Sequence, residues 1–196
     1  MEAAKKALDE TAGVQLDLVA ESLPSDVDGI LSGFGIGTHA PAFKGSIKVQ
    51  THGISVDVPV IAVDGKVYAQ TPFSTSMSVI DPGKYGAPDP AALFTATTGI
   101  SSLLTEIQGL TRGESVRGGA SNDEILTEYT GTLPASAVTR VIPSATGDDF
   151  TVSFQVAADN ELREAVLTGE FYPGAGDVTY TLTLTNYGVT QDIQAP

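Results

Sequence analysis

The sequence FKGSIKVQTHGISVDVPVIAVDGKVYAQ occupies residues 43–70 and contains three runs rich in apolar and β-branched residues. Short turns, Thr51–Gly53 and Asp64–Gly65, separate the runs. An Asp-Gly pair between such runs favours a two-residue hairpin. Because strands joined by turns this short must be antiparallel, the stretch predicts an antiparallel meander. Its three strands are expected at Phe43–Gln50, Ile54–Val63 and Lys66–Gln70.

The last third of the chain alternates apolar and polar residues even more regularly. Val178, Tyr180, Leu182 and Leu184 fall on one face of a predicted strand, and four threonines fall on the other. Similar patterns occur on both sides of the meander, and about eight or nine strands are expected in all. The further strands are predicted at Val14–Glu21, Thr111–Arg117, Glu124–Thr132, Phe150–Ala157, Leu162–Phe171 and Val178–Tyr187.

Short helical patterns interrupt these strands. Asp89 followed by Pro90 is typical of an N-cap with proline at the first helical position. Ile100, Leu103, Leu104 and Ile107 follow the spacing of one apolar helical face. Helices are therefore predicted at Ala3–Thr11, at Pro90–Thr95, from Thr98 through Ile107 and at Pro134–Ile142, with a helical turn at Asp26–Leu31 and an irregular connection at Met77–Pro90.

This order of elements predicts the fold class. Antiparallel strands interrupted by short helices indicate an α+β fold, with one strongly curved antiparallel sheet and helices against one of its faces. A chain of 196 residues is long enough to bury a substantial core. Since no long linker or internal repeat divides it, residues 1–196 are expected to form a single domain.

Composition excludes several classes of function. The chain has 24 acidic and 10 basic residues, a net charge of −14, which opposes binding to nucleic acid and adsorption to anionic lipid surfaces through charge alone. It has no cysteine, and hence neither disulfides, thiolate metal sites nor cysteine nucleophiles. No apolar run approaches the length of about 18 residues that a membrane-spanning helix needs.

Catalytic patterns are weak. The two histidines, His39 and His52, are both predicted in exposed loops, and the G-x-S-x-G motif of serine hydrolases is absent. Gly33-x-Gly35-x-Gly37 is not a dinucleotide motif, because Pro41 prevents the helix that should follow. Asp26–Gly29 lacks the further oxygen ligands of a calcium loop, so a capped turn is favoured. We therefore expect no enzyme activity, no cofactor and no metal.

Four segments, in order, resemble the actinobacterial LppX/LprA/LprF/LprG lipoprotein family. They cover most of the chain, and their order and spacing carry the resemblance. In the last segment Tyr187 stands where the family usually has tryptophan, and residues 23–42 depart from the family's more regular pattern. The matching segments are Val58–Ala69 (VPVIAVDGKVYA), Ser78–Ile100 (SVIDP through TGI), Thr130–Val138 (TGTLPASAV) and Leu182–Val189 (LTLTNYGV).

The resemblance implies a half-barrel of antiparallel strands with short helices on its concave face, enclosing a hydrophobic cavity. In that cavity the protein would bind multi-acylated lipids or glycolipids and carry them across or within the cell envelope without catalysis. The implied ligands are phosphatidylinositol mannosides, lipoglycans, triacylglycerol or phthiocerol-type waxes, and the implied partner is a membrane lipid exporter. The parent lipoprotein would be held at the outer face of the plasma membrane by an N-terminal lipid anchor. The lipobox cysteine that carries the anchor is not in this chain, as expected if the leader has been removed.

The expected cavity residues are the apolar faces of the central and third helices and of facing strands. For each of them, an ordinary place in a filled core is the alternative. The predicted lipid-binding residues are Ile47, Val49, Val60, Leu93, Phe94, Ile100, Leu103, Leu104, Ile107, Val138, Val141, Ile142, Val152 and Phe154.

Two other functions remain open at the level of sequence. One is a structural or interaction lipoprotein of the envelope, with a filled core and no lipid ligand. The other is a hydrolase acting on envelope lipid or glycan, which would require a catalytic cluster around His39 or His52. A cavity between the sheet and the helices would favour lipid binding over both.

Overall fold

The structure is a computed structural model that describes residues 1–21, 23–71, 74–119 and 121–196. Eleven strands in these residues form one antiparallel sheet in the order β6-β5-β4-β3-β2-β1-β11-β10-β9-β8-β7. The strands are β1 Gly13–Glu21, β2 Gly29–Thr38, β3 Ala42–Thr51, β4 Ile54–Val63, β5 Lys66–Ala69, β6 Ser78–Ile80, β7 Gln108–Gly118, β8 Glu124–Pro134, β9 Asp149–Ala157, β10 Leu162–Gly169 and β11 Val178–Thr185.

The sheet consists of two meanders joined by its first and last strands. Strands β1–β6 follow one another in space, as do β7–β11, and β1 pairs with β11 in the middle. At this junction Leu16 lies opposite Leu184 and Leu18 lies opposite Leu182. Because directly opposed residues share a face, the junction places four leucines side by side on one face of the sheet.

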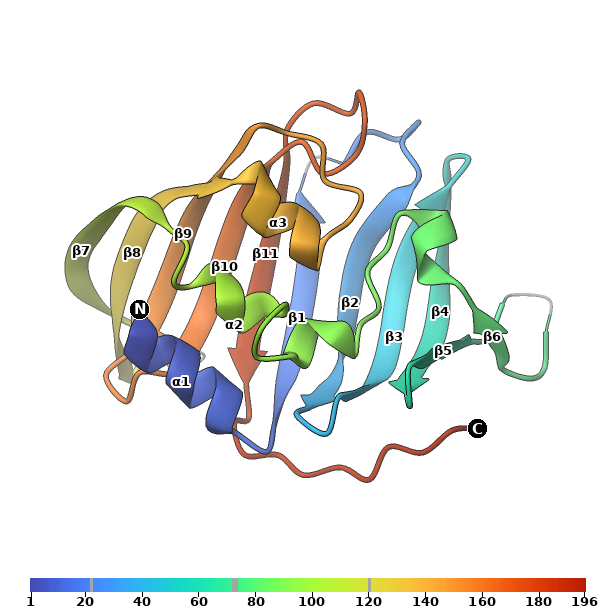
Figure 1. Ribbon diagram of the computed structural model, residues 1–196, viewed down its shortest axis with the longest axis horizontal. Coiled ribbons are helices and arrows are strands. Elements are labelled where there is room, and N and C mark those ends of the chain that lie inside the picture. The colour runs from blue at the N-terminus through green and yellow to red at the C-terminus, as the bar shows by residue number, and fades with distance from the viewer. Residues whose placement is uncertain (22, 72–73, 120) are drawn as a thin grey trace.

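All the helices lie on that face, across a sheet that curves around them (Figure 1). Helix α1 buries Ala4 and Leu8 in the core and exposes Glu2, Lys6 and Glu10. The helices are α1 Glu2–Glu10, the 3-10 helices η1 Pro82–Tyr85 and η2 Ala92–Phe94, α2 Ile100–Leu103 and α3 Ala135–Val141. The predicted α+β class, a curved antiparallel half-barrel with short helices on its concave face, is confirmed.

The core lies between the sheet and the helices. Strand β11 alternates between buried residues and half-buried threonines, as its sequence predicts. Phe150 and Phe154 of β9 are fully buried and belong to the same hydrophobic cluster as α1, α2 and α3. One continuous sheet over one main cluster supports a single domain over 1–196, which stays a prediction.

The prediction for residues 26–37 was wrong. Residues 29–31, predicted as part of a helical turn, begin β2, and the glycine-rich stretch that follows was not predicted as a strand at all. The reason is visible on the concave face, where β2 presents Gly33, Gly35 and Gly37. A Cβ atom on Gly35 would lie 2.5 Å from the Phe43 ring, and one on Gly37 would lie 2.0 Å from the Phe94 ring. These glycines make room for aromatic rings.

Other differences concern the segment between the two meanders. The helix predicted at Pro90–Thr95 is the single 3-10 turn η2, and the helix expected to reach Ile107 ends at Leu103. The connection predicted as irregular at Met77–Pro90 contains β6 and η1. The strand count was therefore two or three too low. The predicted helix at Pro134–Ile142 is confirmed as α3 within one residue at each end.

No helix in the described residues has the length and hydropathy that crossing a membrane requires.

Candidate ligand cavity

A cavity of about 110 Å³ lies between the middle of the sheet and the segments that cover it, partly open to the outside. Its floor is the junction of the two meanders, where the concave face carries leucines and other apolar side chains. The floor residues are Leu16 and Leu18 of β1, Ile30 of β2, Phe154 of β9, Ala165 and Leu167 of β10, and Tyr180 and Leu182 of β11.

The roof and rim come from the covering helices and from two loops. Leu93, Ile100 and Leu103 cover the floor from η2 and α2. Val141 and Ile142 approach from the end of α3, and a rim is formed by four residues of the η1–η2 and β10–β11 connections. These rim residues are Gly86, Pro88, Phe171 and Tyr172. Among the described residues, no charged side chain lines the cavity.

The cavity contains two hydroxyl groups, and both are already hydrogen-bonded. The Ile30 amide donates to the Tyr172 hydroxyl at 2.9 Å, the two tyrosine hydroxyls lie 2.8 Å apart, and the Tyr180 hydroxyl donates to the Ile30 carbonyl at 2.7 Å. This ring holds β2 at the point where its register with β3 shifts. Burial raises the pKa of Tyr180, so the hydroxyl stays protonated. The cavity therefore offers a ligand no free polar partner at these tyrosines.

A much smaller void of about 10 Å³ adjoins the cavity beneath α1. Leu93 and Ile100 belong to the walls of both, and the rest of its wall comes from α1, β11, η2, α2 and the end of β2. The other five residues are Leu8, His39, Phe94, Ser101 and Leu184.

The comparisons with known proteins agree with this arrangement. Residues 1–193 match the family described as LppX_LprAFG lipoprotein. The chain belongs to this family. No curated protein sequence matches it. The predicted membership of the LppX/LprA/LprF/LprG family is thereby confirmed.

Two solved structures of the family have the same fold. LprF from Mycobacterium bovis superposes with a TM-score of 0.77 at 16% identity, over 100% of this chain and 94% of that one. The Mycobacterium tuberculosis lipoprotein LppX gives a TM-score of 0.70 at 18% identity, over 98% and 95%. Neither the family description nor these names denote an enzyme, and membership of a lipoprotein family indicates association with the cell envelope.

Six of the fourteen predicted lipid-binding residues line the cavity: Leu93, Ile100, Leu103, Val141, Ile142 and Phe154. Their contact with a lipid stays a prediction. The sequence analysis missed the leucines of β1 and β11 that form much of the floor. The alternation in both strands already placed them on one face, but it did not reveal that these two strands are neighbours.

The other eight predicted residues lie elsewhere. Phe94 lines only the small void. Ile47, Val49 and Val60 lie on β3 and β4, beyond the cavity. Val152 of β9, Leu104 and Val138 are packed in the filled core. Ile107 lies against Gly131 of β8: a Cβ atom added to Gly131 would lie 2.5 Å from the Ile107 side chain.

The two histidines differ in their exposure to solvent. His52 is exposed in the β3–β4 turn, as predicted, and its backbone amide donates to Asp28 at 2.7 Å. This hydrogen bond lowers the pKa of Asp28, which caps that turn. His39 lies in the turn after β2, as predicted, but the predicted exposure was wrong: the residue is half-buried, with its ring edge-on to Phe94 and its Nε2 atom buried.

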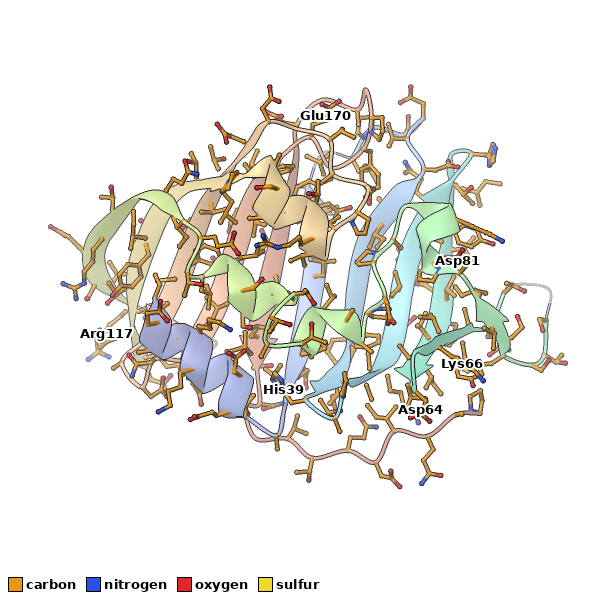
Figure 2. All side chains as sticks on the ribbon, viewed as in Figure 1. His39, Asp64, Lys66, Asp81, Arg117 and Glu170 are labelled. Carbon is orange, nitrogen blue, oxygen red and sulfur yellow. The ribbon has the colours of Figure 1, made fainter. Side chains whose placement is uncertain are left out.

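The described residues contain no group of three or more His, Cys, Asp or Glu side chains that could hold a metal ion. Figure 2 shows Arg117 at the β7 edge and Asp64 and Lys66 in the β4–β5 turn, at opposite ends of the sheet. His39 lies near the end of β2, away from these charges (Figure 2). The polar arrangement gives no support to the hydrolase interpretation.

Tyr187 has a structural role. Its hydroxyl donates to the Leu162 carbonyl at 2.8 Å, and Arg163 lies 5.6 Å above its ring. Arg163 also donates to Glu124 and Glu161, at 2.7 Å and 2.5 Å. These contacts tie β8 and β10 to the segment after β11, at a distance from the cavity lining.

Proposed function

We propose that this protein binds the hydrocarbon chains of acylated lipids or glycolipids in the cavity and carries them across or within the cell envelope, without catalysis. The observation that carries this proposal is the apolar cavity at the β1–β11 junction, whose two hydroxyl groups are consumed by the Tyr172–Tyr180–Ile30 ring. A site of this kind excludes a polar headgroup and favours hydrocarbon.

The energetics suit a carrier. Each methylene moved out of water gains about 0.8 kcal/mol, so ten methylenes gain about 8 kcal/mol. A bilayer offers the same chain nearly the same gain. Exchange between membrane and cavity is therefore close to neutral, while escape into water is strongly unfavourable. Net flow in one direction then needs an energy source outside this protein, for which a membrane lipid exporter is the proposed partner.

The cavity is too small for a whole multi-acylated lipid. One water molecule occupies about 10–15 Å³ of such a volume, so a cavity of about 110 Å³ holds on the order of eight groups the size of a methylene. A whole multi-acylated lipid requires the cover to move. Within the described residues, backbone hydrogen bonds of residues 82–106 join that segment only to itself or to neighbouring Asp81, and none reaches the sheet. Apolar packing holds it down, together with three polar links among the described residues: Lys5 to the Ala96 carbonyl, Lys5 to the Ser101 hydroxyl, and Arg140 to Glu106.

The proposed lipid classes rest on the family resemblance rather than on the cavity. We propose phosphatidylinositol mannosides, lipoglycans, triacylglycerol or phthiocerol-type waxes as ligands. The proposed location is the outer face of the plasma membrane, with an N-terminal lipid anchor on the parent lipoprotein.

A cavity-filling substitution tests the proposal. Ala165 lies on the cavity floor and is 1% exposed. In Ala165→Leu the added carbons occupy the cavity, so we expect co-purifying lipid to fall several-fold while the lipid-free protein keeps or gains stability. Native mass spectrometry and lipid analysis of an organic extract measure the first effect, and chemical unfolding measures the second.

Ala137→Leu is the matched control. Ala137 is fully buried in α3 and lines neither the main cavity nor the small void. Its enlargement over-packs the core, which costs about 1–3 kcal/mol and leaves lipid occupancy unchanged. Full occupancy in Ala165→Leu, or a wild-type protein that carries no lipid, would leave the envelope structural protein as the better interpretation.

A further inference from the structure

The main cavity and the small void beneath α1 have two wall residues in common. Leu93 of η2 and Ile100 of α2 are the residues that the two walls share. Both side chains are hydrocarbon and neither is held by a hydrogen bond. The two spaces therefore adjoin at these side chains.

The floor continues where the two spaces adjoin. Leu16 lines the main cavity and Leu184 lines the small void, and the two lie directly opposite each other on β1 and β11. A hydrocarbon chain lying along this floor would pass from one space to the other without leaving the apolar surface.

The wall of the small void is less apolar than that of the main cavity. His39 and Ser101 contribute to its wall, and the Lys5 ammonium lies 3.5 Å from the Ser101 hydroxyl. The Nε2 atom of His39 is buried there without a partner in the described part of the chain. Because burying polar groups against hydrocarbon is costly, these residues mark where an apolar chain must stop.

We propose that Leu93 and Ile100 form a partition that sets the length of hydrocarbon chain the cavity accepts, and that the small void is the continuation of the same site. This inference rests on the proposed lipid-binding function and assigns these two residues a role in chain-length specificity. The partition limits the wild-type protein to the main cavity, and its removal joins the two spaces into one channel that ends at His39.

The experiment measures affinity for a homologous series of saturated fatty acids, bound as monomers. In the wild-type protein affinity rises with chain length and then levels off where the cavity is full. In Leu93→Ala the plateau moves to chains longer by about three carbons, the number the substitution removes. Because each accommodated methylene raises affinity about fourfold, the longest chains gain on the order of 50-fold.

Three further variants make the test specific. Ile100→Val removes one methylene with little risk to folding, and its plateau moves by about one carbon. Adding Ser101→Leu to Leu93→Ala refills the small void and returns the plateau to the wild-type length. Leu104→Ala perturbs the buried core beside α2 but lines neither space, so it lowers the melting temperature without moving the plateau.

The two possible failures are distinguishable. A wild-type protein that binds no member of the series overturns the proposed function itself. Binding by the wild type with the same plateau in Leu93→Ala and in Ile100→Val overturns the partition and leaves the proposed function standing.

Discussion

The glycines on the concave face of β2 differ in how much room a side chain would have. A Cβ atom at Gly35 would lie 2.5 Å from the Phe43 ring and 2.6 Å from the Lys44 carbonyl oxygen. At Gly33, on the same face of the same strand, the nearest atoms are the side chains of Ile47 and Leu18, at 3.8 and 3.9 Å. The first position has no room for a methyl group and the second has.

We therefore expect opposite outcomes for two identical substitutions. Gly35→Ala forces the Phe43 ring or the β3 backbone to move, and should lower the free energy of unfolding by about 1–3 kcal/mol. Gly33→Ala should leave it unchanged or raise it by about 0.5–1 kcal/mol, because alanine loses less conformational freedom on folding than glycine. Urea unfolding of both variants checks this. Equal losses at both positions would contradict the close packing on β2.

For a single residue, the sequence predicts the face of the sheet on which its side chain lies better than it predicts which helix or loop covers that side chain. Leu182 and Val60 both belong to strands of regular alternation, and both are buried on the concave face. Only Leu182 borders the cavity, because η2 and α2 stand off from the floor at this point. The position of the covering helices depends on long-range packing, which no local pattern encodes.

Among the elements, β2 and β11 are joined through side chains as well as through their shared neighbour β1. The ring of Ile30, Tyr172 and Tyr180 fixes the irregular part of β2 against β11 and the β10–β11 connection. The Tyr180 hydroxyl is buried, and burial raises its pKa above the ordinary value of about 10.

This raised pKa predicts a loss of stability in alkaline solution. Above pH about 10 the unfolded chain releases the Tyr180 proton while the folded protein retains it, so the unfolded state binds fewer protons. The stabilisation is complete below pH 10 and decreases as pH rises, by about 1.4 kcal/mol per pH unit. Tyr180→Phe should make this dependence shallower by that amount, and should cost about 1–3 kcal/mol at neutral pH by leaving the Ile30 carbonyl unpaired.

Chemical unfolding across a pH series measures both effects. Tyr85→Phe is the control, because the Tyr85 side chain is 66% exposed, and its removal should change neither. A slope in Tyr180→Phe equal to that of the wild type would show that the hydroxyl ring does not form in solution.

Strands and helices were predicted correctly where the sequence pattern that defines them lies within the element and its turns. The meander at residues 43–70 and strand β11 were predicted because alternation and turn residues coincide there. Strand β2 was missed because its concave face carries glycines, whose place is filled by rings from β3 and η2. Helix α2 is shorter than its apolar spacing suggested, because Ile107 packs on Gly131 beside the start of β7 rather than continuing the helix.

For the molecule as a whole, the curvature of the sheet provides the space for hydrocarbon, and the net charge affects how the protein approaches a membrane. The β1–β11 pairing closes two local meanders into one curved sheet and thereby creates the concave space for hydrocarbon. The surface outside that space belongs to a chain with a net charge of −14. A carrier of lipids must approach a membrane, and anionic membranes repel a protein of this charge.

The proposed function therefore predicts a salt dependence of lipid exchange. With vesicles that contain anionic phospholipid, transfer of a fluorescent acyl lipid from the protein should be slow at low ionic strength. It should become faster as salt is added, because screening shortens the range of the repulsion to about 10 Å at 0.1 M. With purely zwitterionic vesicles the rate should hardly change, which separates charge from any general effect of salt on the cavity. The opposite result, fastest transfer to anionic vesicles at low salt, would mean that a local basic surface docks on the bilayer. The exposed arginines of β7, Arg112 and Arg117, would then be the first residues to replace.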